Sequence, residues 1–274
     1  MPKLSISRAW EETQHVLARD GRLLASVALA LVLLPEVVAN VLAPPPALSG
    51  QQPPAWMPVL SLAVFVAGLI AQIAVIRLAL GPTTSVGDAI AHGAKRFLPG
   101  FAATLLFVLP LGLLMGVAFT LIAGPAAALA LRNGAVDPAA SRVVLLLLIV
   151  AVLVSARFQL IMPVTTAETG GPLRILRRAW ELSSGHYLRL LGFLVAIIVT
   201  VLIIYLAAQF VGGIVASTLF GEAKPLSVAA LVVALVTGLV QTAFVVVVST
   251  LLARIYAQLA GVHAAQVGVP RSGI

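Results

Sequence analysis

One carboxylate, Glu36, lies inside the first long apolar run of the sequence, between Leu23 and Leu42. At the rise of an α-helix it is roughly two-thirds of the way along that segment. A charged group within a membrane span is costly and usually marks a transport path or a ligand site, so Glu36 is a candidate functional residue. The alternative is structural: Glu36 lies near the outer interface, beside a kink at Pro35, and pairs with Arg132 or water.

Three arginines, Arg77, Arg157 and Arg254, each lie at or near the C-terminal end of an apolar run. A guanidinium group can hold two phosphate oxygens and stays charged when partly desolvated. The matching positions predict a ring of basic side chains that binds an anionic lipid headgroup or substrate. The alternative is that each arginine independently extends toward the phosphates of the membrane surface.

Glu168 precedes a basic stretch and could orient a helix by pairing with Arg174, Arg177 or Arg178, which would be a structural role. No acid, base or nucleophile is spaced to work with it, and the histidines do not have metal-ligand spacing. Phosphate-binding and dinucleotide-binding motifs are also missing from the sequence. We therefore expect no catalytic, metal or cofactor site, and a protein that is not an enzyme by itself.

The composition favours a membrane protein, since 61% of the 274 residues are hydrophobic and 9% are charged. Soluble domains carry about 25% charged residues, so this chain has too little polar surface to coat a soluble globule. The net charge of +8 comes from single basic residues scattered between apolar runs, and not from one basic face. We expect membrane lipids, and alternatively other membrane proteins, as partners, and no nucleic acid.

Six apolar runs are long enough to cross the hydrocarbon core as helices. They are also too long and too uniformly apolar for barrel strands. The predicted spans are Leu23–Leu42, Trp56–Leu80, Phe97–Leu121, Val143–Val164, Leu190–Leu219 and Leu226–Leu252.

The distribution of basic residues predicts the orientation of these spans. The breaks at 43–54, 132–134 and 221–225 carry few positive charges, whereas the opposite ends carry most of the Lys and Arg residues. Positive charge accumulates on the cytoplasmic side of membrane proteins. We therefore expect both the N-terminus and the C-terminus in the cytoplasm.

The sequence also carries signs of an internal repeat. Arg8-Ala9-Trp10-Glu11 recurs as Arg178-Ala179-Trp180-Glu181, in amphipathic stretches that precede odd-numbered spans. Such stretches are typical of short helices that lie in the membrane interface. The predicted fold is therefore an all-α membrane domain over 1–274, with three units of an interfacial amphipathic helix plus a transmembrane hairpin, at 5–80, 82–164 and 171–261.

Two stretches resemble a bacterial family, the glycerophosphoryl diester phosphodiesterase membrane domain family. The similar positions are Pro163-Val164, Glu168 to Gly171, Arg174 to Arg178, Leu182 to Gly185, and Arg254 to Gly261. In members that give the family its name, this membrane region precedes a soluble phosphodiesterase domain, and we expect none in this chain. The resemblance implies a membrane fold in the bacterial inner membrane, and not an activity.

Two functions fit these observations. The first is a non-catalytic membrane module that binds lipid or partner proteins. The alternative is a small transporter or lipid-translocating protein with a cavity between repeats; a membrane-embedded hydrolase ranks third. In a transporter, Glu36 and the glutamines of the spans should line a polar cavity, whereas in a module they should face neighbouring helices. Those glutamines are Gln72, Gln159, Gln209 and Gln241.

Overall fold

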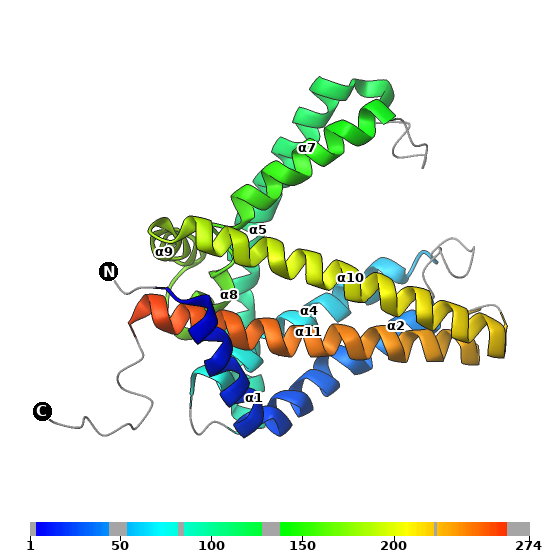
Figure 1. The fold of residues 1–274 in the computed structure, drawn as a ribbon, viewed down its shortest axis with the longest axis horizontal. Coiled ribbons are helices and arrows are strands. Elements are labelled where there is room, and N and C mark those ends of the chain that lie inside the picture. The colour runs from blue at the N-terminus through cyan, green and yellow to red at the C-terminus, as the bar shows by residue number, and fades with distance from the viewer. Residues whose placement is uncertain (1–3, 44–53, 82–84, 128–137, 222–223, 262–274) are drawn as a thin grey trace, which may run out of the picture. The chain divides into compact units, whose positions relative to one another are not determined.

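A computed structural model describes residues 4–43, 54–81, 85–127, 138–221 and 224–261, and all regular elements in these ranges are helices (Figure 1). Within these ranges, five helical stretches are long and apolar enough to cross a membrane: Ile6–Leu42, Met57–Leu80, Val86–Ala123, Tyr187–Phe220 and Val228–Ala260. The chain is thus an all-α, multi-pass membrane protein. A sixth apolar stretch, Ala140–Ser155, is shorter, so the six spans and the three repeats stay predictions.

The chain divides into two compact units. Unit 1 consists of Met1–Leu98 and Ala196–Ile274, and unit 2 of Pro99–Val195. The boundaries fall within two long helices, α5 (Val86–Ala123) and α10 (Tyr187–Phe220), so both helices contribute to both units. This division does not follow the predicted repeat boundaries.

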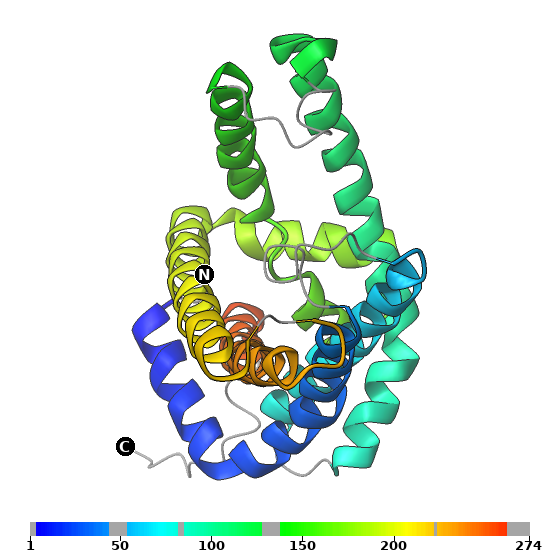
Figure 2. The ribbon, with the colours of Figure 1, turned by 90° about the vertical axis from the view of Figure 1, so that its right-hand side faces the viewer.

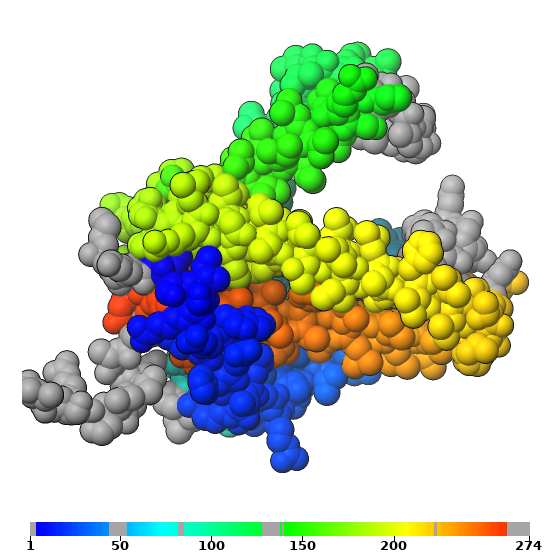
Figure 3. Space-filling view, viewed as in Figure 1, coloured from blue at the N-terminus to red at the C-terminus, as the bar shows by residue number. Residues whose placement is uncertain are grey.

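Unit 1 is built around α11 (Val228–Ala260), and residues 249–259, near the C-terminal end of this helix, are almost all buried. The N-terminal helix α1 (Ile6–Ala28) lies across α11 and also packs on α4 (Met57–Leu80) (Figure 3). The chain continues from α1 through the π-helix η1 (Leu29–Leu33) into α2 (Leu34–Leu42), which packs on α4 and α11. The unit is thus a bundle with α11 at its centre.

A π-helical turn precedes Pro35. Proline has no backbone N–H, so it cannot donate to the carbonyl of the residue four positions earlier, and a helix with an internal proline needs a local adjustment. The N–H of Leu34 donates to the carbonyl of Leu29, five residues earlier, which is the π pattern. The adjustment predicted at Pro35 thus takes the form of a widened turn between α1 and α2.

Small residues allow close approach between helices of unit 1. A Cβ atom added at Gly238 would lie 2.8 Å from Leu33 Cδ1, and one added at Gly93 would lie 2.7 Å from the backbone oxygen of Ile70. At the far end of the bundle the N–H of Leu226 donates to the carbonyl of Val41 at 2.9 Å. These contacts fix α11 against η1 and α2, and the start of α5 against α4.

Unit 2 contains residues from Pro99 onward in α5, then α7 (Pro138–Ser155), α8 (Ile161–Ala167), α9 (Pro172–Ser184) and the start of α10. The amphipathic α9 is a separate short helix, as predicted for the third interfacial stretch. The other two stretches differ from the prediction, because each runs without a break into a long helix, α1 through η1 into α2, and α5 itself.

The predicted continuous helix from Val143 to Val164 is wrong. Helix α7 ends at Ser155, a turn covers 156–160, and α8 follows. Pro163 cannot donate to the carbonyl of Gln159, which favours a break at this point. The side chain of Gln159 replaces lost backbone bonds, since its Nε2 donates to the carbonyls of Ala156 at 3.1 Å and Leu190 at 2.9 Å.

Candidate functional site

A cleft of about 590 Å³ lies between four helices of unit 1. Its walls come from the η1–α2 segment, α4, α10 at Ile197 and Val201, and α11. Figure 2 views α10 and α11 nearly along their axes. The lining residues are Val32, Glu36, Ala39, Asn40, Met57, Ser61, Val64, Phe65, Gly68, Leu69, Gln72, Ile197, Val201, Gln241, Phe244, Val245, Val248 and Ser249.

Helical periodicity explains why these residues share one space. On α4, Ser61, Gly68 and Gln72 recur at intervals of seven and four residues, which places them on one face of the helix. On α2, Glu36 and Asn40 are one turn apart. On α11, the lining residues are Gln241 and the residues three, four, seven and eight positions after it, a spacing that places them on one face of the helix. The cleft is therefore lined by one face of each helix.

Glu36 lies in the cleft wall and is half-buried. The Nδ2 group of Asn40 donates to the Glu36 backbone carbonyl at 3.0 Å and to its carboxylate at 3.4 Å. The alternative partner, Arg132, lies outside the described residues. No Lys or Arg side chain in the described part of the chain is within ion-pair distance of Glu36.

The other polar groups of the cleft are neutral. Ser61 and Gln72 come from α4, and Gln241 and Ser249 come from α11. Aliphatic side chains and two aromatic rings make up most of the remaining surface. An apolar cleft of this size with a few polar groups is typical of a site for a small ligand, in which the apolar wall supplies affinity and the polar groups fix orientation.

Gly68 leaves open space on the α4 side of the cleft. A Cβ atom added at this position would meet no heavy atom within 4 Å. The same is true of Gly112 on α5, which belongs to unit 2 and does not line the cleft. A larger side chain at Gly68 can therefore narrow the cleft, and the same change at Gly112 is its control.

Two of the four span glutamines, Gln72 and Gln241, line the cleft. Gln159 and Gln209 do not. Gln159 bonds two backbone carbonyls in unit 2, and the Nε2 group of Gln209 donates to the hydroxyl of Tyr205 at 2.9 Å. The sequence analysis therefore identified two glutamines that line the cleft, but it did not distinguish them from the two that make local structural contacts.

Arg254 is directed to the C-terminal end of α4. Its Nη2 group donates to the carbonyl of Ala79 at 2.5 Å, and its Nε is buried with no hydrogen-bond partner among the described residues. Ala79 belongs to the last turn of α4, where carbonyls lack partners within the helix and where a positive charge is favourable. Arg77 lies in that same last turn and is half-buried. Arg254 thus caps α4.

Arg157 has a different environment, in unit 2. The central carbon of its guanidinium group lies 4.7 Å from the ring centre of Trp180 and 4.7 Å from that of Tyr187. The Tyr187 hydroxyl donates to the carbonyl of Leu153 at 2.9 Å, which fixes the second ring. Cation–π attraction therefore holds Arg157 between aromatic residues of α9 and α10.

The predicted anion-binding ring of Arg77, Arg157 and Arg254 includes residues from both units. Two of the three arginines have defined contacts within their own unit, one with a helix end and one with aromatic rings. The ring stays a prediction.

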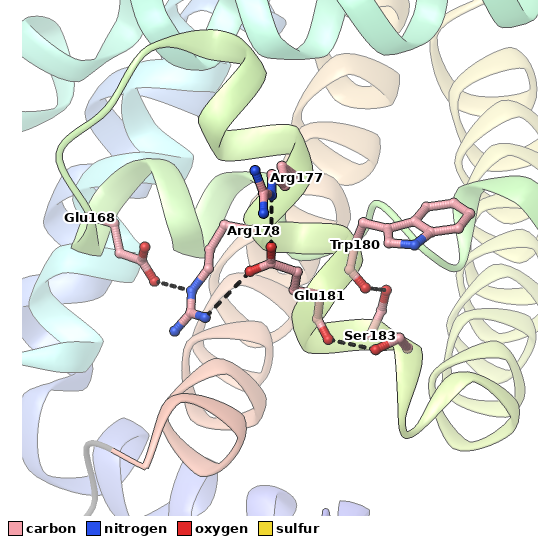
Figure 4. A network of polar contacts seen from close by, with 7 residues as sticks. Glu168, Arg177, Arg178, Trp180, Glu181 and Ser183 are labelled. Atoms are coloured by element: carbon pink, nitrogen blue, oxygen red, sulfur yellow. Dashed lines mark hydrogen bonds and ion pairs between the residues drawn. The ribbon is translucent and has the colours of Figure 1, made fainter.

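Glu168 lies at the end of α8 and pairs with α9. Its Oε1 accepts a hydrogen bond from Arg178 Nε at 2.9 Å, and Arg178 also lies 3.8 Å from a carboxylate oxygen of Glu181 (Figure 4). Of the other predicted partners, Arg177 pairs with Glu181 at 2.9 Å. The side chain of Arg174 packs close to Gly170. The Glu168–Arg178 contact joins the end of α8 to α9, whereas the contacts with Glu181 lie within α9.

Sequence reasoning missed Asn40, Ser61, Gly68 and Ser249 as cleft residues, and Trp180 and Tyr187 as the rings that hold Arg157. The one-turn spacing of Glu36 and Asn40 was a usable signal. The row of small and polar residues on one face of α4 was another. Neither signal says which neighbouring helix the face meets.

The long apolar helices and the cleft define a multi-pass α-helical membrane protein with an internal ligand-sized site. The chain belongs to the family of the DUF7847 domain of unknown function, which matches residues 4–259. Comparisons with curated proteins and with solved structures give no significant match. The resemblance to the glycerophosphoryl diester phosphodiesterase membrane domain family stays a prediction, because none of these findings bears on it.

Proposed function

We propose that this is a non-catalytic membrane protein that binds a lipid or another amphiphile in the cleft of unit 1. The observation that carries the proposal is one carboxylate, Glu36, with amide and hydroxyl groups on the wall of an otherwise apolar cleft between membrane helices. A ligand with an apolar body and a polar end matches such a surface, and a hydrophilic metabolite does not.

The size of the cleft supports this proposal. Ligand sites usually measure about 300–1,000 Å³, and the cleft falls within that range. The space suits one acyl chain or a headgroup with part of its chain. An amphiphile that enters from the bilayer leaves one apolar surrounding for another, so the polar groups of the cleft would decide which amphiphile binds.

Photo-crosslinking tests the proposal. The full chain, reconstituted in phospholipid nanodiscs, is irradiated with a phospholipid that carries a diazirine on its acyl chain, and the labelled peptides are mapped. We expect labels on the cleft faces of α4 and α11. Gly68→Leu should remove these labels because the new side chain fills open space, whereas Gly112→Leu should leave them unchanged. Labels that do not respond to Gly68→Leu would argue against a ligand in the cleft.

A second candidate function is translocation of a lipid or small amphiphile. The observation that favours it is that Glu36, Gln72 and Gln241 all face the cleft, as expected for a transport path. The test uses vesicles with a fluorescent phospholipid that dithionite quenches only in the outer leaflet. Translocation is supported if the fluorescence of the inner leaflet is lost faster with the wild type than with Gly68→Leu. Equal rates would argue against translocation and leave binding as the proposed function.

A further inference from the structure

We infer that the amphiphile in the cleft carries an ammonium group, which pairs with the carboxylate of Glu36. This inference rests on the proposed function and goes further by naming the chemical class of the ligand. It follows from the charge, the aromatic rings and the neutral polar groups of the cleft.

The described residues that line the cleft include an acidic side chain and no basic one. Among the described residues that line it, Glu36 alone is ionisable. The contact partner of its carboxylate is the neutral amide of Asn40, at 3.4 Å. An ionised carboxylate between membrane helices normally has a cationic partner. Since the described residues supply none, a positively charged ligand group is the complementary partner.

An anionic headgroup fits the same surface poorly. Glu36 would repel a phosphate or sulfate, and such repulsion is a common way to exclude the wrong ligand. Within unit 1, Arg254 is already used at the end of α4 and does not line the cleft. A zwitterionic or cationic amphiphile is compatible with the cleft when its ammonium group faces Glu36.

The rings of Phe65 and Phe244 add a second feature that suits ammonium. They come from α4 and α11 and both line the cleft. Aromatic faces attract ammonium groups, including quaternary ones. A divalent metal ion instead requires about six oxygen ligands in a compact shell, and the cleft offers a single carboxylate.

The rest of the wall suits an alkyl chain. Val64, Leu69, Ile197, Val201 and Val245 provide aliphatic surface in the same cleft. The shared chemistry is therefore an alkylammonium amphiphile. Two sources would supply it: a phospholipid with an amino headgroup, and a single-chain amine.

Equilibrium binding of radiolabelled dodecyltrimethylammonium to the full chain in a neutral maltoside detergent tests the inference. Wild type should bind it saturably. Glu36→Gln keeps the shape of the side chain and removes its charge, so affinity should fall about tenfold or more. Gly68→Leu should abolish binding, and Gly112→Leu should not change it. Dodecyl sulfate should compete much more weakly than dodecylamine.

Competitors identify the source of the ammonium group. Displacement by phosphatidylethanolamine at lower concentration than by dodecylamine indicates a phospholipid ligand, and the reverse indicates a single-chain amine. Either result supports the inference. The inference would be overturned if dodecyl sulfate and dodecylamine displaced the ligand equally and Glu36→Gln had no effect. The proposed function would still stand in that case if Gly68→Leu abolished binding. No saturable binding of any of these amphiphiles would overturn both.

A second variant keeps the test decisive if Glu36→Gln does not fold. Gln241→Lys places a basic side chain on the cleft wall of α11, where its ammonium group can pair with Glu36. Ammonium binding should then fall about tenfold, while a neutral amphiphile, followed by the diazirine label, still enters the cleft. Unchanged ammonium binding in this variant would contradict the pairing.

Discussion

Arg254 shows how a residue that resembles a ligand-binding group can have a structural role. Its Nη2 group donates to the carbonyl of Ala79 at the end of α4, and its Nε is buried. Arg254→Gln should lower the free energy of unfolding by about 1.5–3 kcal/mol, because a hydrogen bond from a charged donor to a helix end is lost. Unfolding in detergent, followed by circular dichroism, measures this.

Arg77→Gln is the matched control for that change. Arg77 lies in the same last turn of α4, and its side chain makes no hydrogen bond or ion pair to the described part of the chain. We expect an effect of about 0.5 kcal/mol or less. Equal losses in the two variants would contradict the capping role of Arg254.

Binding of anionic lipid tests the predicted ring separately. If Arg77, Arg157 and Arg254 share one ligand, Gln substitutions should weaken binding of phosphatidylglycerol, and the losses should not add. If each arginine acts alone, the losses should be small and additive. The two contacts already described make the single variants at Arg157 and Arg254 sensitive to stability, so binding is compared only among variants that remain folded.

Two glycines of unit 1 differ in what a larger side chain would meet, because Gly93 faces backbone and Gly238 faces the end of a side chain. A methyl group at Gly93 would lie 2.7 Å from the backbone oxygen of Ile70, whereas one at Gly238 would lie 2.8 Å from the end of the Leu33 side chain. Backbone cannot move aside as a side chain can. Gly93→Ala should therefore destabilise unit 1 by about 1–3 kcal/mol, and Gly238→Ala by less. Equal thermal shifts for the two variants would contradict this difference.

Individual residues were predicted from the sequence with uneven success. Glu36 stands out because charge is rare in an apolar run, and it does line a cleft. Gly68 and Ser249 carry no such signal, since their role depends on which helices meet. The contacts of Arg254 and Arg157 were also not predictable, because the basic end of a span looks the same whether it meets lipid, a helix end or an aromatic ring.

At the scale of the elements, α8 and α9 are held together by the Glu168–Arg178 pair. The side chains are 27% and 38% exposed, so solvent screens the attraction, and we expect a coupling of about 1 kcal/mol or less. A double-mutant cycle of Glu168→Gln and Arg178→Gln measures it. Hydrogen exchange of α9 should speed up in both single variants, and no further in the double variant.

Hydropathy predicted the long helices well and their interruptions poorly. The predicted span Trp56–Leu80 matches α4 closely, and Leu226–Leu252 covers most of α11, which continues to Ala260. After Pro58 in the first turn of α4, neither helix contains a proline. The run from Val143 to Val164 is equally apolar, yet the helix is interrupted before Pro163, and the side chain of Gln159 donates to carbonyls at the interruption. A mean hydropathy over about 20 residues does not reflect the loss of one backbone N–H group at a proline.

At the scale of the whole molecule, the number of spans decides the placement of the termini. In the described part of the chain, five helices are long enough to cross, and Ala140–Ser155 is a shorter apolar helix. If six segments cross, the two termini share one side, as the basic residues predict. If α7 does not cross, the termini are on opposite sides. The chain has no cysteine, so introduced cysteines report on this without background.

Labelling with an impermeant maleimide in intact cells therefore tests the orientation. Cysteines at Gln51 and Asp137, both outside the described residues, should react from the outside. A cytoplasmic probe is better placed at Ser184, which is exposed, than at Gly170, where a side chain would meet Arg174. Ser184→Cys should react only after the cells are permeabilised. Ser184→Cys is the decisive position, because it follows α7, whereas Asp137 precedes α7 and should react from the outside whether or not α7 crosses. Reaction of Ser184→Cys in intact cells, together with Gln51→Cys and Asp137→Cys, would contradict the six-span topology.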